Sequence, residues 1–457
     1  MPKFPKSASR PLALAVTLSV LLAACSQPQG ATPTSALPAD DLGLWAAPAN
    51  VPADVPGELI VKVRARTPLN AQTLGLGALL LRAERLTPGG DVYRLTVPSG
   101  REAQALHTLS ARGTVAYAER NHTYTPQGAY IVNDTFYSTL WGLQGSTTQP
   151  ASPYGTGAAA AWARGYTGSA SVYVGVVDTG VQIDHPDLAA QVWTNPADPA
   201  DGVDNDGNGY VDDTRGWNFT DGSSALYTGN ADKHGTHVAG IIGARANNAQ
   251  GVAGVNWAVN LIPTKFLGTS GYGDTANAVS AIAYLTDLKV NRGVNVVAIN
   301  SSWSGAPSQA LYDAISAAND AGILFVASAG NNGVNADAQP AYPAAYDLPN
   351  VVSVTAIDKA GALPSWANTG AGSVDLGAPG VSIRSTVNGS TYATADGTSM
   401  ATAFVTGAAA LYASTHPGVS PSALKAALLA SVTPTASLQG RTVTGGRLDV
   451  ARLMTLP

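Results

Sequence analysis

The sequence predicts an α/β fold in which a mostly parallel central sheet is flanked by helices, preceded by a smaller α+β domain. From residue 172 onward, short apolar runs alternate with helical runs, which is the pattern of parallel strands joined by helical crossovers. In such sheets, functional side chains follow the carboxyl ends of strands. The expected strands are 172–178, 294–300, 323–327 and 351–356, and the expected helices include 309–321 and 421–430.

The first 55 residues carry signals for export. A basic start precedes the apolar run 11–22, which is too short for a comfortable transmembrane helix. The following Leu-Ala-Ala-Cys, ending at Cys25, looks like a bacterial lipobox, in which the cysteine is lipidated and becomes the mature N-terminus. An ordinary signal peptide with an incidental cysteine is the alternative. We predict a lipoprotein signal peptide over 1–24 and a Pro-, Ala- and Ser-rich tether over 25–55.

Residues 56–127 predict a small α+β domain. Alternating apolar residues predict strands at 57–63, 92–97 and 115–119, and an amphipathic pattern predicts a helix at 101–110. The remaining residues, 128–457, contain the alternating strand and helix pattern.

Composition narrows the function classes. The 457 residues carry a net charge of −5, so the chain lacks the basic footprint of a nucleic-acid-binding protein. Hydrophobic residues make up 45% of the chain, which is not a disordered composition. Cys25 is the only cysteine, so no intramolecular disulfide can form, and any cross-linking must come from packing or bound ions.

Three polar residues stand out against apolar surroundings. Asp178 ends the apolar strand 172–178, His234 begins an apolar helix, and Ser399 precedes the helical run 400–411. Taken singly, they could be a strand-end cap, a surface helix residue and a helix N-cap. Their order along the chain, Asp then His then Ser, is one known for nucleophilic triads.

Together the segments VVDTG, HGTHVAG and GTSMA resemble the subtilisin-like serine peptidases, or subtilases, over roughly residues 128–457. The resemblance implies a subtilisin-like three-layer α/β/α fold and a serine endopeptidase without a catalytic metal. In it, Asp178 orients the imidazole, His234 is the general base and acid, and Ser399 is the nucleophile. His237, the second histidine of its motif, is expected to pack. Ala403 departs from the usual proline, at little expected catalytic cost.

The resemblance also assigns the oxyanion donor and the substrate cleft. Asn331, which follows the strand 323–327, would donate its amide together with the Ser399 N–H, although alone it could be a turn asparagine. Substrate would bind as an extra strand between two extended segments. The expected contacts are Gly271, Tyr272, Gly273, Ser302, Trp303 and Ser304 in these segments, and Ala329 and Gly330 in the primary pocket, with Ala341 near its floor.

Trp303 departs from the smaller apolar residue usual at its position, and should wall the pocket for the fourth residue before the cut. The segments that line the primary pocket contain no Asp or Glu, so we expect a preference for apolar rather than basic side chains.

Two structural calcium sites are predicted. The acidic stretch 204–213 places Asp204, Asp206 and Asn208 at alternate positions around a glycine turn, which suits calcium but could also be a solvated acidic turn. By resemblance, a second site joins residues of the N-terminal arm and of a later loop. Its expected ligands are the side chains of Asp134, Asp187 and Asn248 and the carbonyls of Arg245, Gln250 and Val252.

The resemblance further implies that 56–127 is a propeptide that inhibits its own peptidase domain, with processing in or beside 124–128. The expected partners are polypeptide substrates and this propeptide. We expect no nucleic acid, and membrane contact only through the lipid anchor. The protein would be exported, as a cell-envelope lipoprotein or an extracellular enzyme. The competing hypotheses are a non-catalytic envelope lipoprotein that keeps the fold as a binding module, and a narrow processing protease.

Overall fold

The structure is a computed structural model that describes residues 54–64, 69–86, 90–122 and 132–457. The predictions for Cys25, for the tether and for the processing segment lie outside the described residues. No helix of the described part is long and apolar enough to cross a membrane.

Residues 54–122 form a small α+β unit with a hydrophobic core of its own, as predicted. Its antiparallel sheet has the strand order β2-β3-β1-β4, and helix α2 packs on β1 and β4. The short strand β2 and helix α1 were not predicted. The elements are β1 (Asp54–Val63), α1 (Ala71–Leu74), η2 (Gly77–Leu79), β2 (Arg82–Arg85), β3 (Val92–Thr96), α2 (Glu102–Ser110) and β4 (Val115–His122).

Residues 132–457 form the larger unit around a nine-stranded sheet with the order β14-β15-β11-β10-β9-β8-β5-β7-β6. Every neighbouring pair in this sheet is parallel except β14 and β15. The strands are β5 (Gly168–Asp178), β6 (Trp217–Asn218), β7 (Ala258–Lys265), β8 (Val296–Ser301), β9 (Leu324–Ser328), β10 (Val351–Ile357), β11 (Leu376–Pro379), β14 (Thr433–Pro434) and β15 (Gly446–Arg447), and a separate hairpin joins β12 (Ile383–Val387) to β13 (Thr391–Ala395).

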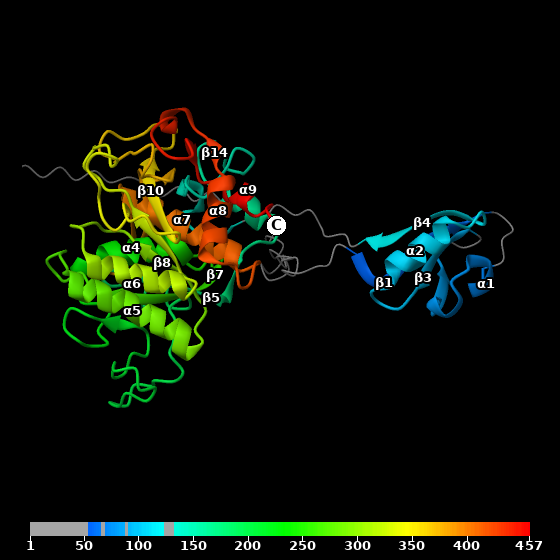
Figure 1. Ribbon diagram of the computed structural model, residues 1–457, viewed down its shortest axis with the longest axis horizontal. Helices are drawn as coiled ribbons and strands as arrows, with labels where there is room; N and C mark the ends of the chain where they lie inside the picture. The colour runs from blue at the N-terminus through cyan, green and yellow to red at the C-terminus, as the bar shows by residue number, and fades with distance from the viewer. Residues whose placement is uncertain (1–53, 65–68, 87–89, 123–131) are drawn as a thin grey trace, which may run out of the picture. The chain divides into compact units, whose positions relative to one another are not determined.

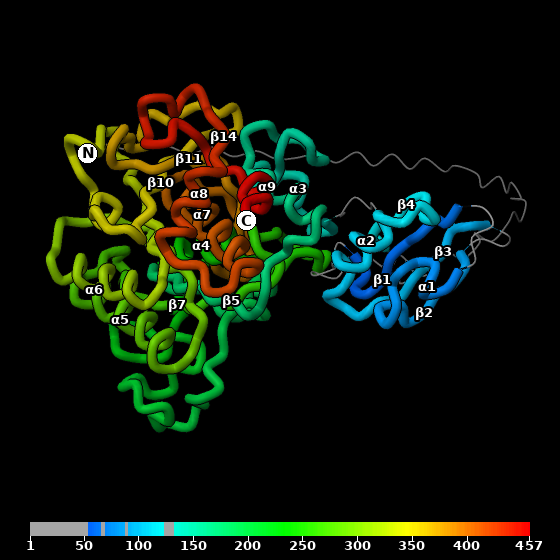
Figure 2. The backbone as a smooth tube through the Cα atoms, turned by 45° about the vertical axis from the view of Figure 1, so that its right-hand side comes forward, coloured from blue at the N-terminus to red at the C-terminus, as the bar shows by residue number. Residues whose placement is uncertain are grey.

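Helices cover both faces of this sheet, so the predicted three-layer α/β/α architecture is confirmed. Helices α5 and α6 pack side by side over one core (Figure 1), and α4, α7 and α8 belong to the other core (Figure 2). The helices are η3 (Tyr137–Thr139), α3 (Ala158–Trp162), η4 (Asn230–Asp232), α4 (Lys233–Gly243), α5 (Thr275–Arg292), α6 (Gln309–Asp320), α7 (Thr398–Ala413), α8 (Pro421–Ala430), η5 (Ala436–Leu438) and α9 (Val450–Leu453).

The central strands are apolar on both faces because each face meets a helical layer. Along β9, Leu324 and Val326 belong to the core under α7, whereas Phe325 and Ala327 belong to the core under α5 and α6. This alternation follows from the two-residue period of a strand. Helix α7 is buried along its whole length, which explains why small and apolar residues surround it on every side.

Candidate active site

Asp178 is the last residue of β5, and its side chain is fully buried. Its Oδ1 accepts a 2.7 Å hydrogen bond from the Thr179 N–H. The chain then turns at Gly180, where φ is +116° and a Cβ atom would lie 2.5 Å from the Leu226 carbonyl oxygen. Only glycine fits such a turn, so the strand ends in a carboxylate held in one place.

His234 lies in the first turn of α4, with Nδ1 at 2.8 and 3.0 Å from the two carboxylate oxygens of Asp178. Burial of the imidazole opposes its protonation, but the charge and hydrogen bond of Asp178 outweigh burial and raise the pKa of His234 above its ordinary value. When Nδ1–H donates to Asp178, the neutral ring leaves Nε2 free to accept a proton. The pair therefore has the geometry of an oriented general base.

Ser399 is the second residue of α7, so it is not a helix N-cap. That position is taken by Gly397, which makes no side-chain capping bond. The Ser399 hydroxyl donates to the Ser302 carbonyl oxygen at 3.1 Å, and it must release this carbonyl before it can donate to His234. The Ser399 N–H belongs to the first turn of α7, where backbone N–H groups have no partner within the helix.

A buried polar chain behind Ser399 was missed by sequence reasoning. The Ser302 hydroxyl donates to the Ser399 carbonyl oxygen at 2.9 Å, and it accepts a 2.9 Å bond from Asn300 Nδ2. The Asn300 Oδ1 in turn accepts a 2.9 Å bond from the Thr406 hydroxyl. The signal was the presence of polar residues in the otherwise apolar β8 and α7. This chain of hydrogen bonds fixes the backbone of Ser399.

Asn331 lies in the turn after β9, with its amide oxygen facing the start of α7. Its Oδ1 accepts hydrogen bonds from the Thr398 N–H at 3.0 Å and from the Thr398 hydroxyl at 2.9 Å. These two bonds fix the side-chain rotation. The Nδ2 of Asn331 is held on the side of Gly397, where a Cβ atom would lie 3.7 Å from it. The amide donor is thus held beside the helix start that carries Ser399.

A groove of about 500 Å³ runs between the segments that follow β7 and β8. Phe266, Leu267 and Ala278 contribute to one side of it, and the other side includes Trp303 and Ser304. The Trp303 ring packs on Phe266 with centroids 4.7 Å apart, and its Nε1 donates to the Val177 carbonyl at 3.0 Å. The structure therefore places Trp303 in a groove wall and holds its ring in place.

The predicted extended segment 271–273 is wrong at its first residue. Gly271 has a φ of +78° and lies in a turn closed by a 2.8 Å bond from the Gly268 N–H to the Tyr272 carbonyl. The left-handed backbone at Gly271 cannot continue an extended edge. Gly271 nevertheless lines the groove, as do Gly273 and Tyr272, which is 81% exposed.

The predicted primary pocket residues lie at the end of β9. Ala329 is buried, and Gly330 has a φ of +104°. A Cβ atom at Gly330 would lie 2.5 Å from Asn368 Nδ2 and 3.7 Å from the Ala341 Cβ, so Ala341 is its neighbour. His237, expected to pack, is buried, with Nε2 3.0 Å from the Ile383 carbonyl oxygen, and burial lowers its pKa to about 4.

The residues predicted for the second calcium site meet at one place. Asp187 accepts a 2.9 Å bond from the Val252 N–H and a 2.9 Å bond from Asn248 Nδ2. Asp134 accepts bonds from the N–H groups of Asn247 at 2.8 Å and Asn248 at 3.3 Å. Within 132–457, no lysine or arginine pairs with either carboxylate.

Two buried carboxylates without a protein cation are the donor set that a divalent cation would neutralise. Burial raises the pKa of Asp134 to about 6, and the Asp187 charge adds to this rise. The Arg245 N–H donates to the Asp187 carbonyl at 2.8 Å, and the Gln250 N–H donates to the Asn248 amide oxygen at 2.9 Å. That amide would have to turn before its oxygen could face an ion.

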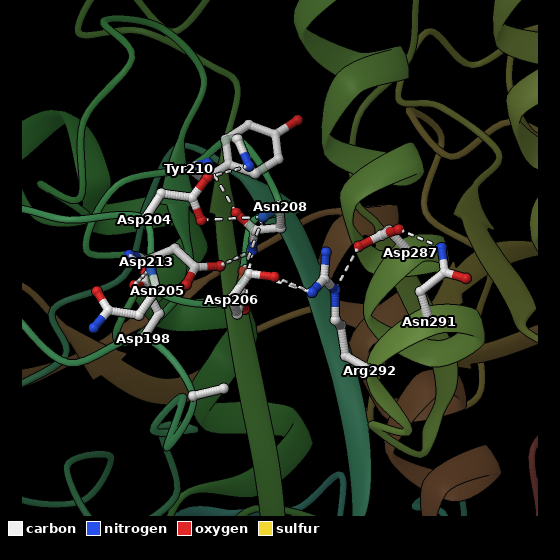
Figure 3. Close-up of polar contacts among 12 residues, drawn as sticks. Asp198, Asp204, Asn205, Asp206, Asn208, Tyr210, Asp213, Asp287, Asn291 and Arg292 are labelled. Carbon is white, nitrogen blue, oxygen red and sulfur yellow. Dashed lines mark hydrogen bonds and ion pairs between the residues drawn. The ribbon is translucent and has the colours of Figure 1, made fainter.

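In the predicted acidic-loop site, the carboxylate oxygens accept hydrogen bonds from N–H groups of the same loop (Figure 3). The carboxylates of Asp204 and Asp206 each accept a 3.0 Å bond from the Asn208 N–H, and Arg292 Nη1 lies 3.9 Å from Asp206 Oδ1. Within the described residues, no group of three or more His, Cys, Asp or Glu side chains is arranged to hold a metal. Both calcium predictions thus depend on amide and backbone oxygens as well as carboxylates.

Comparison with known proteins agrees with this geometry. The family model described as "Subtilase family" matches residues 169–446. Over 297 residues the chain is 38% identical to "Alkaline protease" of Shouchella clausii, covering 64% of this chain and 65% of that protein. It is 40% identical to "Subtilisin Savinase" of Lederbergia lenta over 260 residues, covering 57% of this chain and 82% of that protein.

The chain is also similar to solved structures of proteases. A cold-adapted subtilisin-like serine proteinase aligns with a TM-score of 0.50 and 28% identity, covering 62% of this chain and 90% of its own. A protease of Pseudoalteromonas arctica aligns with a TM-score of 0.57 and 25% identity, covering 71% of this chain and 98% of its own. The family match spans more than half of the chain, and the chain therefore belongs to the subtilase family of subtilisin-like serine endopeptidases.

Proposed function

We propose that this protein hydrolyses peptide bonds through Asp178, His234 and Ser399. The observation that carries the proposal is the buried Asp178 carboxylate, which lies 2.8 Å from His234 Nδ1. Helix α7, which carries Ser399, begins at the same edge of the sheet. A His–Asp pair in which a buried carboxylate orients the imidazole and favours its protonated form supports a working base. A binding module that had lost catalysis would have no need for it.

In the proposed reaction, Ser399 Oγ leaves the Ser302 carbonyl and attacks the scissile carbonyl carbon while its proton passes to His234 Nε2. The charge of Asp178 stabilises the imidazolium that results. The oxyanion receives hydrogen bonds from Asn331 Nδ2 and from the Ser399 N–H. His234 then protonates the leaving amine, the acyl-enzyme forms, and a water molecule activated by the same imidazole hydrolyses it.

A fluorophosphonate probe tests this proposal, because it labels only an activated serine. The mature protein should be labelled once, at Ser399, and should lose its peptidase activity in step with labelling. The matched control is Ser399→Ala, which should take no label. An unlabelled, inactive protein that still binds peptides would instead make the fold a binding module.

The proposed substrates are polypeptides that bind in extended form along the groove, between Tyr272–Gly273 and Ser302–Ser304. The residues expected to line the primary pocket, Ala329, Gly330 and Ala341, include no Asp or Glu, which supports apolar over basic residues before the cut. Cleavage-site profiling on a peptide library checks this preference. A strict requirement for lysine or arginine would contradict it.

We further propose that the enzyme is exported as a self-inhibited precursor. The separate core of residues 54–122 supports a propeptide that folds as a unit of its own, and the motif ending at Cys25 supports a lipid anchor. N-terminal sequencing and intact mass, applied to the mature protein and to the isolated precursor, test these two proposals. A mature N-terminus near residue 128 indicates propeptide removal, whereas a diacylated Cys25 in the isolated precursor indicates anchoring.

Calcium is proposed as a structural ion. The Asp134 and Asp187 carboxylates, with Asn248 and nearby carbonyls, would hold it, and it would link the N-terminal arm to the loop 245–252. Its chemistry there is charge neutralisation without any role in bond cleavage. The acidic loop, with Asp204, Asp206 and Asn208, is proposed as a second site.

A further inference from the structure

Lys265 is a buried cation at the carboxyl end of β7, directly beside the end of β5. Its backbone pairs with Asp178 in the parallel register, and its residue is 1% exposed. An ammonium group carries three donors, and all three are used here. Lys265 Nζ donates to the Asp232 carboxylate, to the Thr179 carbonyl oxygen and, at 3.2 Å, to the Leu267 carbonyl oxygen.

Asp232 is equally buried, and it immediately precedes α4, two residues before His234. Its Oδ1 accepts from Lys265, and its Oδ2 accepts from the N–H and hydroxyl of Thr228 at 2.5 and 2.9 Å. A Cβ atom at Gly180 would lie 2.9 Å from Asp232 Oδ1. The turn that follows Asp178 and the segment that precedes His234 are therefore in close contact at this carboxylate.

Thr179 provides a second connection between the same two segments. Its carbonyl accepts from Lys265, while its hydroxyl accepts a 3.0 Å bond from the Gly235 N–H. Thr179 adjoins Asp178, and Gly235 adjoins His234. The two catalytic side chains thus sit on backbone segments that are joined at two points, one of which is the ion pair.

We propose that the Lys265–Asp232 ion pair is a positioning device that fixes the Asp178 carboxylate relative to His234 and balances the charge beside the imidazole. This inference builds on the proposed triad. Both residues are buried, and neither is among those that line the groove. A buried ion pair often stabilises a fold no better than packed apolar residues do, so stability alone is a weak explanation for it. Its three contacts instead reach the Asp-bearing turn, the His-bearing helix and, through Leu267, the substrate groove.

The two charges shift the pKa of His234 in opposite directions, and these opposite shifts can be measured. Removing the Lys265 cation leaves an uncompensated anion, which favours the imidazolium and should raise the pKa of His234. Removing the Asp232 anion leaves an uncompensated cation and should lower it. At buried sites such charges shift a neighbouring pKa by about half a unit or more. A residue that merely supports folding would not produce opposite shifts.

Other ionisable groups on α4 and on the elements packed against it stay unchanged in every variant, so they cannot produce these opposite shifts. They are Asp178 and Tyr173 on β5, Lys233 and His237 on α4, Arg384 on β12 and Tyr412 on α7.

The test measures kcat/KM against pH for Lys265→Met, Asp232→Asn and the double variant, each matured and purified. The acid limb of this profile reports the pKa of His234. It should move to higher pH in Lys265→Met, to lower pH in Asp232→Asn, and back toward the wild-type position in the double variant. In both single variants kcat should fall about tenfold or more, because small displacements of reacting groups are costly. KM should hold in Asp232→Asn, which leaves the Leu267 contact intact.

Lys425→Met is the matched control. Lys425 pairs with Asp375 at 3.3 Å and donates to the carbonyl of Val351, the first residue of β10, at the sheet edge opposite the triad. This variant should lower thermal stability and leave the pH profile unchanged.

Folded Lys265 and Asp232 variants with wild-type kcat and pH profile would overturn the proposal. If Lys265→Met fails to fold, Asp232→Asn decides alone, since it keeps the side-chain size and one acceptor oxygen, which can face either Lys265 or Thr228. An unshifted acid limb in that variant overturns the proposal too. Failure of the proposed function looks different, because the wild-type protein itself would then lack fluorophosphonate labelling and hydrolysis.

Discussion

Replacing Asn331 by leucine removes the proposed oxyanion donor. The side chain keeps a similar size and the Asp178–His234 pair is untouched, but the amide is lost, and with it the Oδ1 acceptor of the two Thr398 bonds. Loss of one such donor lowers kcat by about 10²–10³, which corresponds to about 3–4 kcal/mol of transition-state stabilisation. The oxyanion exists only in the transition state, so KM should change little.

The structure allows a graded comparison, because Thr398 holds the Asn331 amide by two bonds. Thr398→Val removes the hydroxyl donor at 2.9 Å and leaves the backbone N–H at 3.0 Å. The amide should then lose part of its orientation but remain present. We expect a fall in kcat of roughly tenfold or less, since one neutral hydrogen bond contributes about 1 kcal/mol.

Steady-state kinetics on one peptide substrate, with active sites titrated by a fluorophosphonate, measure both variants per labelled serine. The expected order of kcat is wild type, then Thr398→Val, then Asn331→Leu, with similar KM values. If Asn331→Leu turns over at the wild-type rate, Asn331 is only a turn residue. A raised KM with an unchanged kcat would show that it binds substrate and transition state alike.

Three further predictions concern the nucleophile, the base and the ion. Ser399→Ala should abolish hydrolysis and leave the purified precursor uncut near residues 122–130 on a denaturing gel; maturation of this variant alone would show that another protease does the cutting. Asp178→Asn should lower kcat by roughly 10⁴-fold. It should also move the acid limb of the residual activity to lower pH, because burial without the Asp178 charge lowers the pKa of His234; a limb that stays in place would contradict the assigned cause. EGTA should lower the melting temperature of Ser399→Ala protein, because bound calcium at a hundredfold excess over Kd stabilises the folded state by about 2.7 kcal/mol. Asp187→Asn should reduce this calcium dependence, and identical melting curves with and without EGTA would argue against bound calcium.

Local patterns were enough to predict the elements that repeat a simple period. The apolar runs of β9 and α7 are read directly from neighbouring residues, and the motifs around Asp178 and His234 lie at the ends of such runs. The short strand β2 was missed because Arg82–Arg85 has little apolar character of its own. It forms by pairing with β3, which is a tertiary contact.

The parts of the site that could not be predicted depend on partners far along the chain. A lysine at the end of an apolar strand usually faces water, yet Lys265 is buried because its partner Asp232, 33 residues away, lies at the same sheet edge. The role of Ser302 likewise depends on a carbonyl 97 residues further on. The turn at Gly271 was misjudged because glycine permits both extended and left-handed backbone.

Strand order explains why so many polar groups meet at one edge of the sheet. The neighbouring strands β9, β8, β5 and β7 are parallel, so their carboxyl ends deliver Asn331, Ser302, Asp178 and Lys265 in that spatial order. Helix α4 begins at this edge with His234, and α7 begins there with its unpaired N–H groups and Ser399. The proposed nucleophile, base and oxyanion donors thus come from elements whose ends the sheet aligns. Lys265 adds a buried cation to the same row, at the point where the Asp-bearing strand and the His-bearing helix meet.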